Sequence, residues 1–486
     1  MLNALGVQVR GVSADSRAVA AGEVFLAYPG HGGKYDGRSY IADAVKRGAA
    51  AVLWEREGFG WPEKIRVPNF PVDGLKALAG PLAGEVYGAP SEQLTMVGVT
   101  GTNGKTSVSQ WVAQALSACG RQCGVIGTLG AQFGSWNEPV PNTTPDAIVL
   151  QRTLKRMFDA GAAACAMEAS SIGLDQARVA GVAFDIAVFT NFTRDHLDYH
   201  GSVAAYEKAK TTLFRWPSLT HAVVNIDDPM GVRLMAQIGE DVTRIAYCIA
   251  GKSAVPEFVE DEGRLTASAI RYDDTGLAFD LASDWGHAKV KVPVWGEFNV
   301  SNLLAVIGSL IAAGVGFDQA VTAVQTLAPL PGRMNALSFP DAPLAVIDYA
   351  HTPDALEQAL KALRPIADSR GGALAVVFGC GGDRDAGKRP QMGAVAARLA
   401  DRVLVTSDNP RSEDPLDIIR QILPGAPGAL VEADRRLAIG KALRESQSRD
   451  VLLIAGKGHE DYQEIGGKRL PFSDHEVARI ALENRA

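Results

Sequence analysis

One local pattern recurs along this sequence and constrains its fold more than any other feature: a short apolar run, a cluster of polar residues, and then apolar residues at helical spacing. The apolar runs cover residues 94–99, 163–167, 184–192, 344–350, 373–379, 402–407 and 451–456. Strands that alternate with helices in this way predict parallel, doubly wound sheets, so we expect an α/β fold. Because ligands of such sheets bind at the carboxyl ends of the strands, the polar clusters that follow the runs are the candidate functional segments.

The chain is long enough for several domains. Its 486 residues exceed what a single hydrophobic core usually serves. Glycine and proline interrupt the pattern near residues 85–94 and again near residues 327–335. We therefore predict three domains, at residues 1–88, 89–328 and 329–486.

Charge and hydropathy narrow the classes of partner. The net charge is 48 − 55 = −7, which argues against a nucleic-acid partner. The most apolar run, residues 303–316, is too short to span a bilayer and predicts a core helix. The N-terminal residues lack the apolar core of a signal peptide, and the five cysteines lack paired metal-binding spacing. We expect a cytoplasmic monomer with reduced thiols and no membrane insertion.

The segment GVTGTNGKTS, residues 98–107, departs from the usual phosphate-binding loop, because Val99 stands where that pattern has glycine. Its context nevertheless fits, since an apolar run precedes it and a helical pattern follows. Glycines let backbone N–H groups approach an anion, Lys105 would reach the β- and γ-phosphates, and the Thr106 hydroxyl would bind Mg²⁺. The alternative is a glycine-rich turn with a surface lysine.

The compact spacing of GTNGKTS resembles the ATP loop of the Mur ligases, the amide-bond-forming enzymes of peptidoglycan synthesis, and the resemblance extends over the whole chain. It implies a UDP-binding N-terminal domain, a central doubly wound ATPase domain of P-loop type, and a Rossmann-like C-terminal domain. ATP and Mg²⁺ are the implied cofactors. The loop positions implied to bind ATP are Gly101, Thr102, Asn103, Gly104, Lys105, Thr106 and Ser107.

The resemblance also implies the rest of the nucleotide and metal site. Further ATP positions are Asn299, Asn302, Arg333, Asp348 and His351. The metal positions are Thr106, Glu168, His196 and Lys210, the last as a carbamate, and the implied catalytic residues are Lys105, Glu168, His196 and Lys210. From the residues alone, both Lys208 and Lys210 would be expected on the surface.

Two small-molecule substrates are implied, and each has its own positions. A UDP-N-acetylmuramoyl dipeptide would contact Ser16, His31, Gly32, Gly33, Asn142, Thr143, Thr144, Ser170, Gln176 and Arg178. An amino acid would contact Arg389, Asp408, Asn409, Pro410, Arg411, Gly456 and Glu460. Asn335 stands where the family often has glutamate, and we assign it no role.

The motif DNPR, residues 408–411, resembles the form found in ligases that add meso-diaminopimelate. The implied reaction joins this amino acid to UDP-N-acetylmuramoyl-L-alanyl-D-glutamate through an acyl phosphate. We expect Arg411 to pair with the carboxylate that meso-diaminopimelate has and lysine lacks, and Arg389 to help orient the same substrate. Alternatives are a lysine-adding ligase, a folylpolyglutamate synthetase, and a P-loop NTPase without ligase activity.

Overall fold

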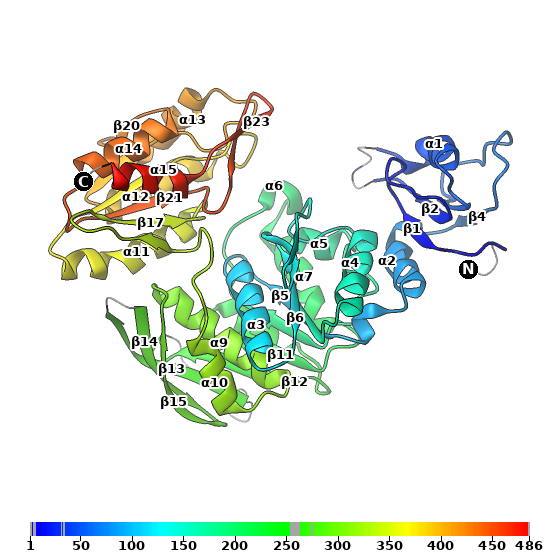
Figure 1. The fold of residues 1–486 in the computed structure, drawn as a ribbon, viewed down its shortest axis with the longest axis horizontal. Coiled ribbons are helices and arrows are strands. Elements are labelled where there is room, and N and C mark those ends of the chain that lie inside the picture. The colour runs from blue at the N-terminus through cyan, green and yellow to red at the C-terminus, as the bar shows by residue number, and fades with distance from the viewer. Residues whose placement is uncertain are drawn as a thin grey trace.

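The computed structural model describes residues 2, 6–30, 32, 35–252, 263–273 and 276–484. Three large sheets and a separate two-stranded hairpin follow one another along the chain, and Figure 1 shows the large sheets in three bodies, coloured blue, cyan to green, and yellow to red. The predicted boundary at 88/89 lies between α2 and β5, and the boundary at 328/329 lies between α10 and β16. The division into three domains at these two points remains our proposal.

The first sheet is parallel, with the strand order β1-β2-β3-β4. Its strands are β1 (Gly11–Ser13), β2 (Glu23–Ala27), β3 (Ala51–Glu55) and β4 (Asn69–Val72), and its helices are α1 (Ile41–Lys46) and α2 (Leu75–Val86). Helix α2 packs closely on the second body because it carries Gly80, where an added Cβ would lie 1.9 Å from the carbonyl oxygen of Ala180.

The second sheet has the order β15-β14-β13-β12-β11-β10-β5-β9-β6-β7-β8. Its strands are β5 (Thr95–Thr100), β6 (Cys123–Gly127), β7 (Gly130–Phe133), β8 (Trp136–Glu138), β9 (Ala164–Glu168), β10 (Ile186–Phe189), β11 (His221–Asn225), β12 (Thr243–Ile249), β13 (Gly263–Asp273), β14 (Gly276–Ser283) and β15 (Gly286–Val292). The strands from β13 to β6 pair in parallel, as predicted. Both edges are antiparallel hairpins, which the helix–strand alternation did not predict.

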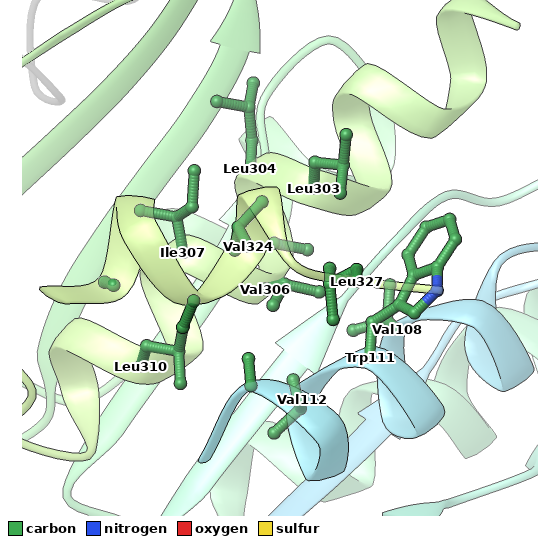
Figure 2. Close-up of a cluster of buried hydrophobic side chains, with 14 of the residues drawn as sticks. Val108, Trp111, Val112, Leu303, Leu304, Val306, Ile307, Leu310, Val324 and Leu327 are labelled. Carbon is green, nitrogen blue, oxygen red and sulfur yellow. The ribbon is translucent and has the colours of Figure 1, made fainter. Parts of the chain in front are cut away.

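Helices cover the second sheet, and one of them was predicted from its apolar run. They are α3 (Lys105–Ala118), α4 (Ala147–Asp159), α5 (Ser171–Asp175), α6 (Leu197–His200), α7 (Val203–Thr211), α8 (Pro229–Met235), α9 (Glu297–Ala312) and α10 (Phe317–Gln325). The run 303–316 begins within α9, whose apolar side chains pack against α3 and α10 (Figure 2). The predicted apolar face of α3 is buried in this core, where the Trp111 indole N–H donates to the carbonyl of Ala328 at 3.0 Å. Within the described residues, no helix is both long enough and apolar enough to cross a membrane.

The third sheet has the order β16-β17-β21-β18-β19-β20 and is parallel except for β16. Its strands are β16 (Asn335–Leu337), β17 (Leu344–Asp348), β18 (Leu374–Phe378), β19 (Arg402–Val405), β20 (Leu430–Val431) and β21 (Val451–Ala455), followed by the hairpin β22 (Tyr462–Ile465) and β23 (Lys468–Pro471). Its helices are α11 (Pro353–Ser369), α12 (Lys388–Leu399), α13 (Pro415–Ile422), α14 (Arg435–Glu445) and α15 (Asp474–Glu483). The molecule is therefore α/β, as expected.

Candidate active site

The polar segment after β5 is a tight loop that requires glycine at two positions. Gly101 has φ +145°, and an added Cβ would lie 1.9 Å from Thr190 Oγ1. Gly104 has φ +85°, and its Cβ would lie 2.5 Å from Asn302 Oδ1. The backbone is therefore open where an anion would approach the start of α3.

The end of β10 holds this loop, which the sequence analysis did not anticipate. Thr190 Oγ1 donates to the carbonyl of Asn103 at 2.6 Å. The Asn191 side chain accepts from the Asn103 N–H at 2.9 Å and donates to the same carbonyl at 3.1 Å. The sequence offered one signal for these two residues. Both lie near the end of the apolar run 184–192, so they fall at the same carboxyl edge of the sheet as the loop after β5.

A cavity of about 510 Å³ opens beside the loop, between the second and third bodies. Its volume lies in the range of small-molecule sites. The predicted residues that line it are Thr102, Asn103, Gly104, Lys105, Thr106, Ser107, Thr143, Glu168, Ser170, His196, Lys210, Asn302, Arg333, Asp348 and His351. Lys105 Nζ donates to the carbonyls of Gly101 and Thr102 at 2.9 and 2.8 Å. Burial lowers the pKa of Lys105, while the Glu168 carboxylate opposes that shift.

Glu168 places a buried carboxylate at the end of β9. Its side chain accepts from the Thr128 N–H at 2.7 Å and the Thr128 hydroxyl at 3.2 Å. Gly127 makes room for it, since a Cβ there would lie 2.2 Å from Glu168 Oε1. Glu168 is 1% exposed, and these two hydrogen bonds hold its carboxylate in one position on the cavity wall.

Lys210 is buried, contrary to the expectation from the residues alone, whereas Lys208 is exposed. The Lys210 side chain is 1% exposed and donates to the carbonyl of Gly101 at 2.6 Å. Its Nζ lies 4.5 Å from the centroid of the Tyr206 ring, one helical turn earlier on α7. Burial, and then the nearby charge of Lys105, lower the pKa of Lys210 well below its usual value, which favours the neutral amine.

Tyr206 connects α7 to the phosphate loop and was also missed. Its hydroxyl lies 3.1 Å from Thr102 Oγ1, which in turn accepts from the N–H of Thr193 at 2.9 Å. Burial raises the pKa of Tyr206, so the phenol keeps its proton. The ring packs beside Phe192 and His200, with centroid separations of 5.0 and 5.2 Å.

His196 lies at the start of α6 in the left-handed region, with φ +52°. Its Nε2 is 3.5 Å from Asp195 Oδ2, and burial lowers the pKa of the imidazole despite that carboxylate. Among the described residues, no three His, Cys, Asp or Glu side chains form a group that could hold a metal.

The third body supplies the opposite wall of the cavity. Arg333 Nη2 donates to Thr106 Oγ1 at 3.1 Å, and its guanidinium lies 4.6 Å from the centroid of the Tyr349 ring. Asp348 is buried and accepts from two backbone N–H groups at 2.8 Å. Burial lowers the pKa of His351 to about 4, so this imidazole is neutral. Asp354, which was not predicted, accepts from the Asn103 amide at 2.9 Å and ties α11 to the loop.

Two residues predicted to bind ATP, Asn299 and Asn302, lie on the central body. Both lie on the first turns of α9 and are buried. The amide of Asn302 donates to Asn299 Oδ1 at 3.0 Å, and Asn299 donates to the carbonyl of Trp295 at 2.8 Å. Asn302 lines the cavity, whereas Asn299 supports it from behind.

The predicted muramoyl-side residues gather next to Glu168. Thr144 Oγ1 donates to the Glu168 carbonyl at 2.8 Å and lies 2.9 Å from Ser170 Oγ. Arg178 donates to the carbonyl of Thr144 at 3.0 Å and pairs with Gln176 Oε1 at 2.7 Å. Thr143 contacts Thr128, while Asn142 is exposed.

On the N-terminal body, the predicted UDP-side residues Ser16 and Gly32 are not among the described residues that line the cavity. Ser16 is buried and Gly32 has φ +66°. His31 and Gly33 lie outside the described residues.

The predicted amino-acid residues meet where β19 and β21 end. Asn409 donates to Glu460 Oε2 at 2.8 Å, and Asp408 Oδ2 lies where a Cβ on Gly456 would approach within 2.4 Å. Pro410 is buried, and Arg411, with φ +53°, donates from Nη1 to the carbonyl of Gly382 at 2.7 Å. None of these residues is among the described residues that line the cavity.

Arg389, predicted to help orient the amino acid, makes several hydrogen bonds within the protein. Its guanidinium makes two 2.8 Å hydrogen bonds to Glu413, one of 2.8 Å to Gln421 and one of 3.2 Å to the carbonyl of Gly381. This pairing lowers the pKa of Glu413 to about 2. With 1% exposure, Arg389 anchors α12 to the segment after DNPR, and its contact with an amino acid stays a prediction.

Comparisons with known proteins agree with this geometry. Three family models match: "Mur ligase family, catalytic domain" at residues 8–87, "Mur ligase middle domain" at 99–310, and "Mur ligase, glutamate ligase domain" at 332–458. The UDP-N-acetylmuramoyl-L-alanyl-D-glutamate–2,6-diaminopimelate ligase of Janthinobacterium sp. (strain Marseille) is 49% identical, covering 98% of this chain and 94% of the relative. The ligase of the same name from Pseudomonas aeruginosa is 49% identical, covering 98% and 95%.

Solved structures show the same similarity. A ligase of that name superposes with a TM-score of 0.68 and 35% identity, covering 98% of this chain and 95% of the other. The MurF ligase of Thermotoga maritima in complex with ADP has the same fold at 18% identity, with a TM-score of 0.66 and 98% of each chain covered. This chain belongs to the Mur ligase family.

Proposed function

We propose that this ligase joins meso-diaminopimelate to UDP-N-acetylmuramoyl-L-alanyl-D-glutamate, with conversion of ATP to ADP and phosphate. The observation that carries the proposal is 49% identity over 98% of the chain to relatives named for this reaction. The arrangement of the chain supports it, because an anion-binding loop and a buried lysine face one cavity and DNPR lies at a sheet edge of the next domain.

The first step transfers the γ-phosphoryl group of ATP to an oxygen of the glutamyl side-chain carboxylate, giving an acyl phosphate and ADP. Lys105 would turn from the carbonyls of Gly101 and Thr102 to the phosphates and offset their developing charge. Ser170, Thr144 and Arg178 lie next to Glu168 and would hold the muramoyl dipeptide beside the phosphate loop.

The residues at the cavity fit Mg²⁺. Thr106 and Glu168 offer hard oxygen donors on one wall, and Mg²⁺ prefers oxygen ligands. Lys210 is a buried amine of lowered pKa, and reaction of its neutral form with CO₂ would add a carbamate oxygen beside His196. When bound, the metal would neutralise phosphate charge.

In the second step, the amine of meso-diaminopimelate attacks the acyl carbon, and the C–O bond to phosphate breaks as the amide forms. DNPR and Glu460 would hold the distal end of meso-diaminopimelate and so orient the molecule for this attack. The UDP group would lie on the N-terminal domain near Ser16, His31, Gly32 and Gly33. We further propose domain boundaries at 88/89 and 328/329, a monomeric state and a cytoplasmic location.

The test measures phosphate release from ATP with Mg²⁺ and the UDP-linked dipeptide, comparing meso-diaminopimelate with L-lysine. We expect release that depends on the amino acid, with roughly 10⁴-fold preference for meso-diaminopimelate in kcat/KM, because lysine leaves the arginine site unpaired. Phosphate release at the same rate with and without an amino acid would instead support a P-loop NTPase. A preference for lysine or for a folyl substrate would support the other ligases.

Arg411→Ala should remove most of that preference, because its guanidinium is the proposed partner of the distal carboxylate. Arg420→Ala, at an exposed arginine of the same domain, is the matched control. An Arg411→Ala enzyme that discriminates as well as the wild type would show that this residue does not set specificity.

A further inference from the structure

Lys457 is a buried cation that the reaction described above does not use. It lies two positions after Ala455, the last residue of β21, and its side chain is 0% exposed. Its Nζ donates to Asn409 Oδ1 at 3.0 Å and to Glu460 Oε2 at 2.8 Å. The ring of Tyr462 lies on a further side, with its centroid 5.4 Å from Nζ.

Both partners of Lys457 are proposed to contact the amino acid, and they also contact each other. The Asn409 amide donates to Glu460 Oε2 at 2.8 Å, and Asn409 Oδ1 accepts a second bond, from the Glu464 N–H at 2.9 Å. Lys457 thereby joins the end of β19, the turn after β21 and the hairpin strand β22. Removal of its ammonium group would leave Asn409 Oδ1 and Glu460 Oε2 one donor short.

The two bonds to Glu460 converge on a single oxygen. Oε2 accepts from Lys457 and from Asn409, whereas Oε1 has no hydrogen-bond partner among the residues that the structure describes. The carboxylate is thus fixed in rotation with one oxygen free, and its side chain is 17% exposed, so a ligand can reach it. A buried ammonium is costly unless it is paired, and here Lys457 pairs with two of the proposed amino-acid-binding residues.

We propose that Lys457 is a positioning residue for the amino-acid substrate: it holds Asn409 and Glu460 so that Glu460 Oε1 accepts an ammonium group of a diamino acid. This inference rests on the proposed function. It assigns Lys457 to the selection of a substrate that carries a second amine, alongside the carboxylate selection proposed for Arg411.

The experiment compares wild type, Lys457→Met and the matched control Lys468→Met, which alters an exposed lysine on the neighbouring strand β23. Lys457→Met should raise KM for meso-diaminopimelate by roughly ten- to a hundredfold, the effect of losing hydrogen bonds to a charged group. KM for ATP and for the UDP-linked dipeptide should stay within about twofold. For 2-aminopimelate, which lacks the second amine, the effect of Lys457→Met should be much smaller.

A double-mutant cycle with Glu460→Gln separates positioning from general destabilisation. If Lys457 acts through Glu460, the double variant should be little worse than Glu460→Gln alone. Lys457→Gln, which retains a donor, should fall between wild type and Lys457→Met, and it serves if the methionine variant does not fold. An unchanged KM for meso-diaminopimelate in both variants, or equal loss with 2-aminopimelate, would overturn the inference. Phosphate release by the wild-type enzyme that does not depend on meso-diaminopimelate would instead overturn the proposed function.

Discussion

At the scale of single residues, the candidate active site contains two lysines, Lys105 and Lys210, whose amines are held by backbone carbonyls. Lys105 and Lys210 both donate to the carbonyl of Gly101, and burial lowers the pKa of each. Two amines that share one acceptor repel each other when both are charged. The arrangement therefore favours a charged Lys105, which Glu168 supports, beside a neutral Lys210.

Lys105→Ala should leave the fold intact and lower kcat by roughly a hundred- to a thousandfold, because one charge is lost where phosphoryl charge develops. The measurement is phosphate release, with thermal unfolding as the check on folding. Lys208→Ala, at an exposed lysine, is the control. A Lys105→Ala enzyme with normal turnover would contradict the assignment of the loop.

Lys210→Ala should abolish activity, and short carboxylates such as acetate should restore part of it by replacing the carbamate oxygen. Because the pKa of Lys210 is lowered, the neutral amine persists below the usual lysine range and is lost as pH falls through the lowered value. Activity in CO₂-depleted buffer should therefore fall, and bicarbonate should restore it. A ¹³C-bicarbonate label that never appears on Lys210 in active enzyme would refute the carbamate.

Where elements join, the site is assembled by ends of strands that are distant in sequence. Left-handed backbone occurs at His196, Met334 and Arg411, each at a junction bordering the cavity or the amino-acid residues. Non-glycine residues in this region carry strain that surrounding contacts must hold. In the loop after β5 the left-handed residues are glycines, Gly101 and Gly104, and hydrogen bonds from the residues after β10 hold the loop in place.

Asn191→Ala should raise KM for ATP by roughly five- to fiftyfold, since two hydrogen bonds to Asn103 are lost and each contributes about 1 kcal/mol. Initial rates at varied ATP provide the measurement. The control is Asn137→Ala, at an exposed asparagine on β8. If both variants keep the wild-type KM, the loop does not depend on β10 for its conformation.

At the scale of the whole molecule, the cavity is formed between two bodies, because residues of both the second and the third body line it. Asp354 on α11 accepts from Asn103, and Arg333 donates to Thr106, so two loop residues contact the C-terminal body directly. The Thr106 hydroxyl oxygen accepts from Arg333 with one lone pair and keeps the other for a further partner. We therefore expect ligand binding in this cavity to be coupled to movement at this interface.

Asp354→Ala should loosen the interface in the nucleotide-free protein, because a hydrogen bond to a charged acceptor is lost. Small-angle X-ray scattering should then give a larger radius of gyration than for wild type. Asp368→Ala, at an exposed residue on the same helix, should not change it. Equal radii for all three proteins would show that this contact does not hold the domains together.

The sequence by itself determined the α/β class and the glycine loop between β5 and α3, because both depend on local order: apolar run, glycines, lysine and helix. It also placed Glu168 correctly at a strand end, since that position follows from the run before it. The antiparallel edges of the central sheet were not predicted, because pairing direction at an edge depends on neighbours far along the chain.

Only the tertiary structure decided which polar groups meet. Lys208 and Lys210 cannot be told apart by local composition. Lys208 is nevertheless exposed, whereas Lys210 is buried with 1% exposure, because burial depends on the packing of α7 against the loop after β5. The sequence likewise did not reveal the protein partners of Arg389 and Lys457. Their partners, Glu413 and Asn409, are 24 and 48 positions away, and only folding brings them within hydrogen-bond distance.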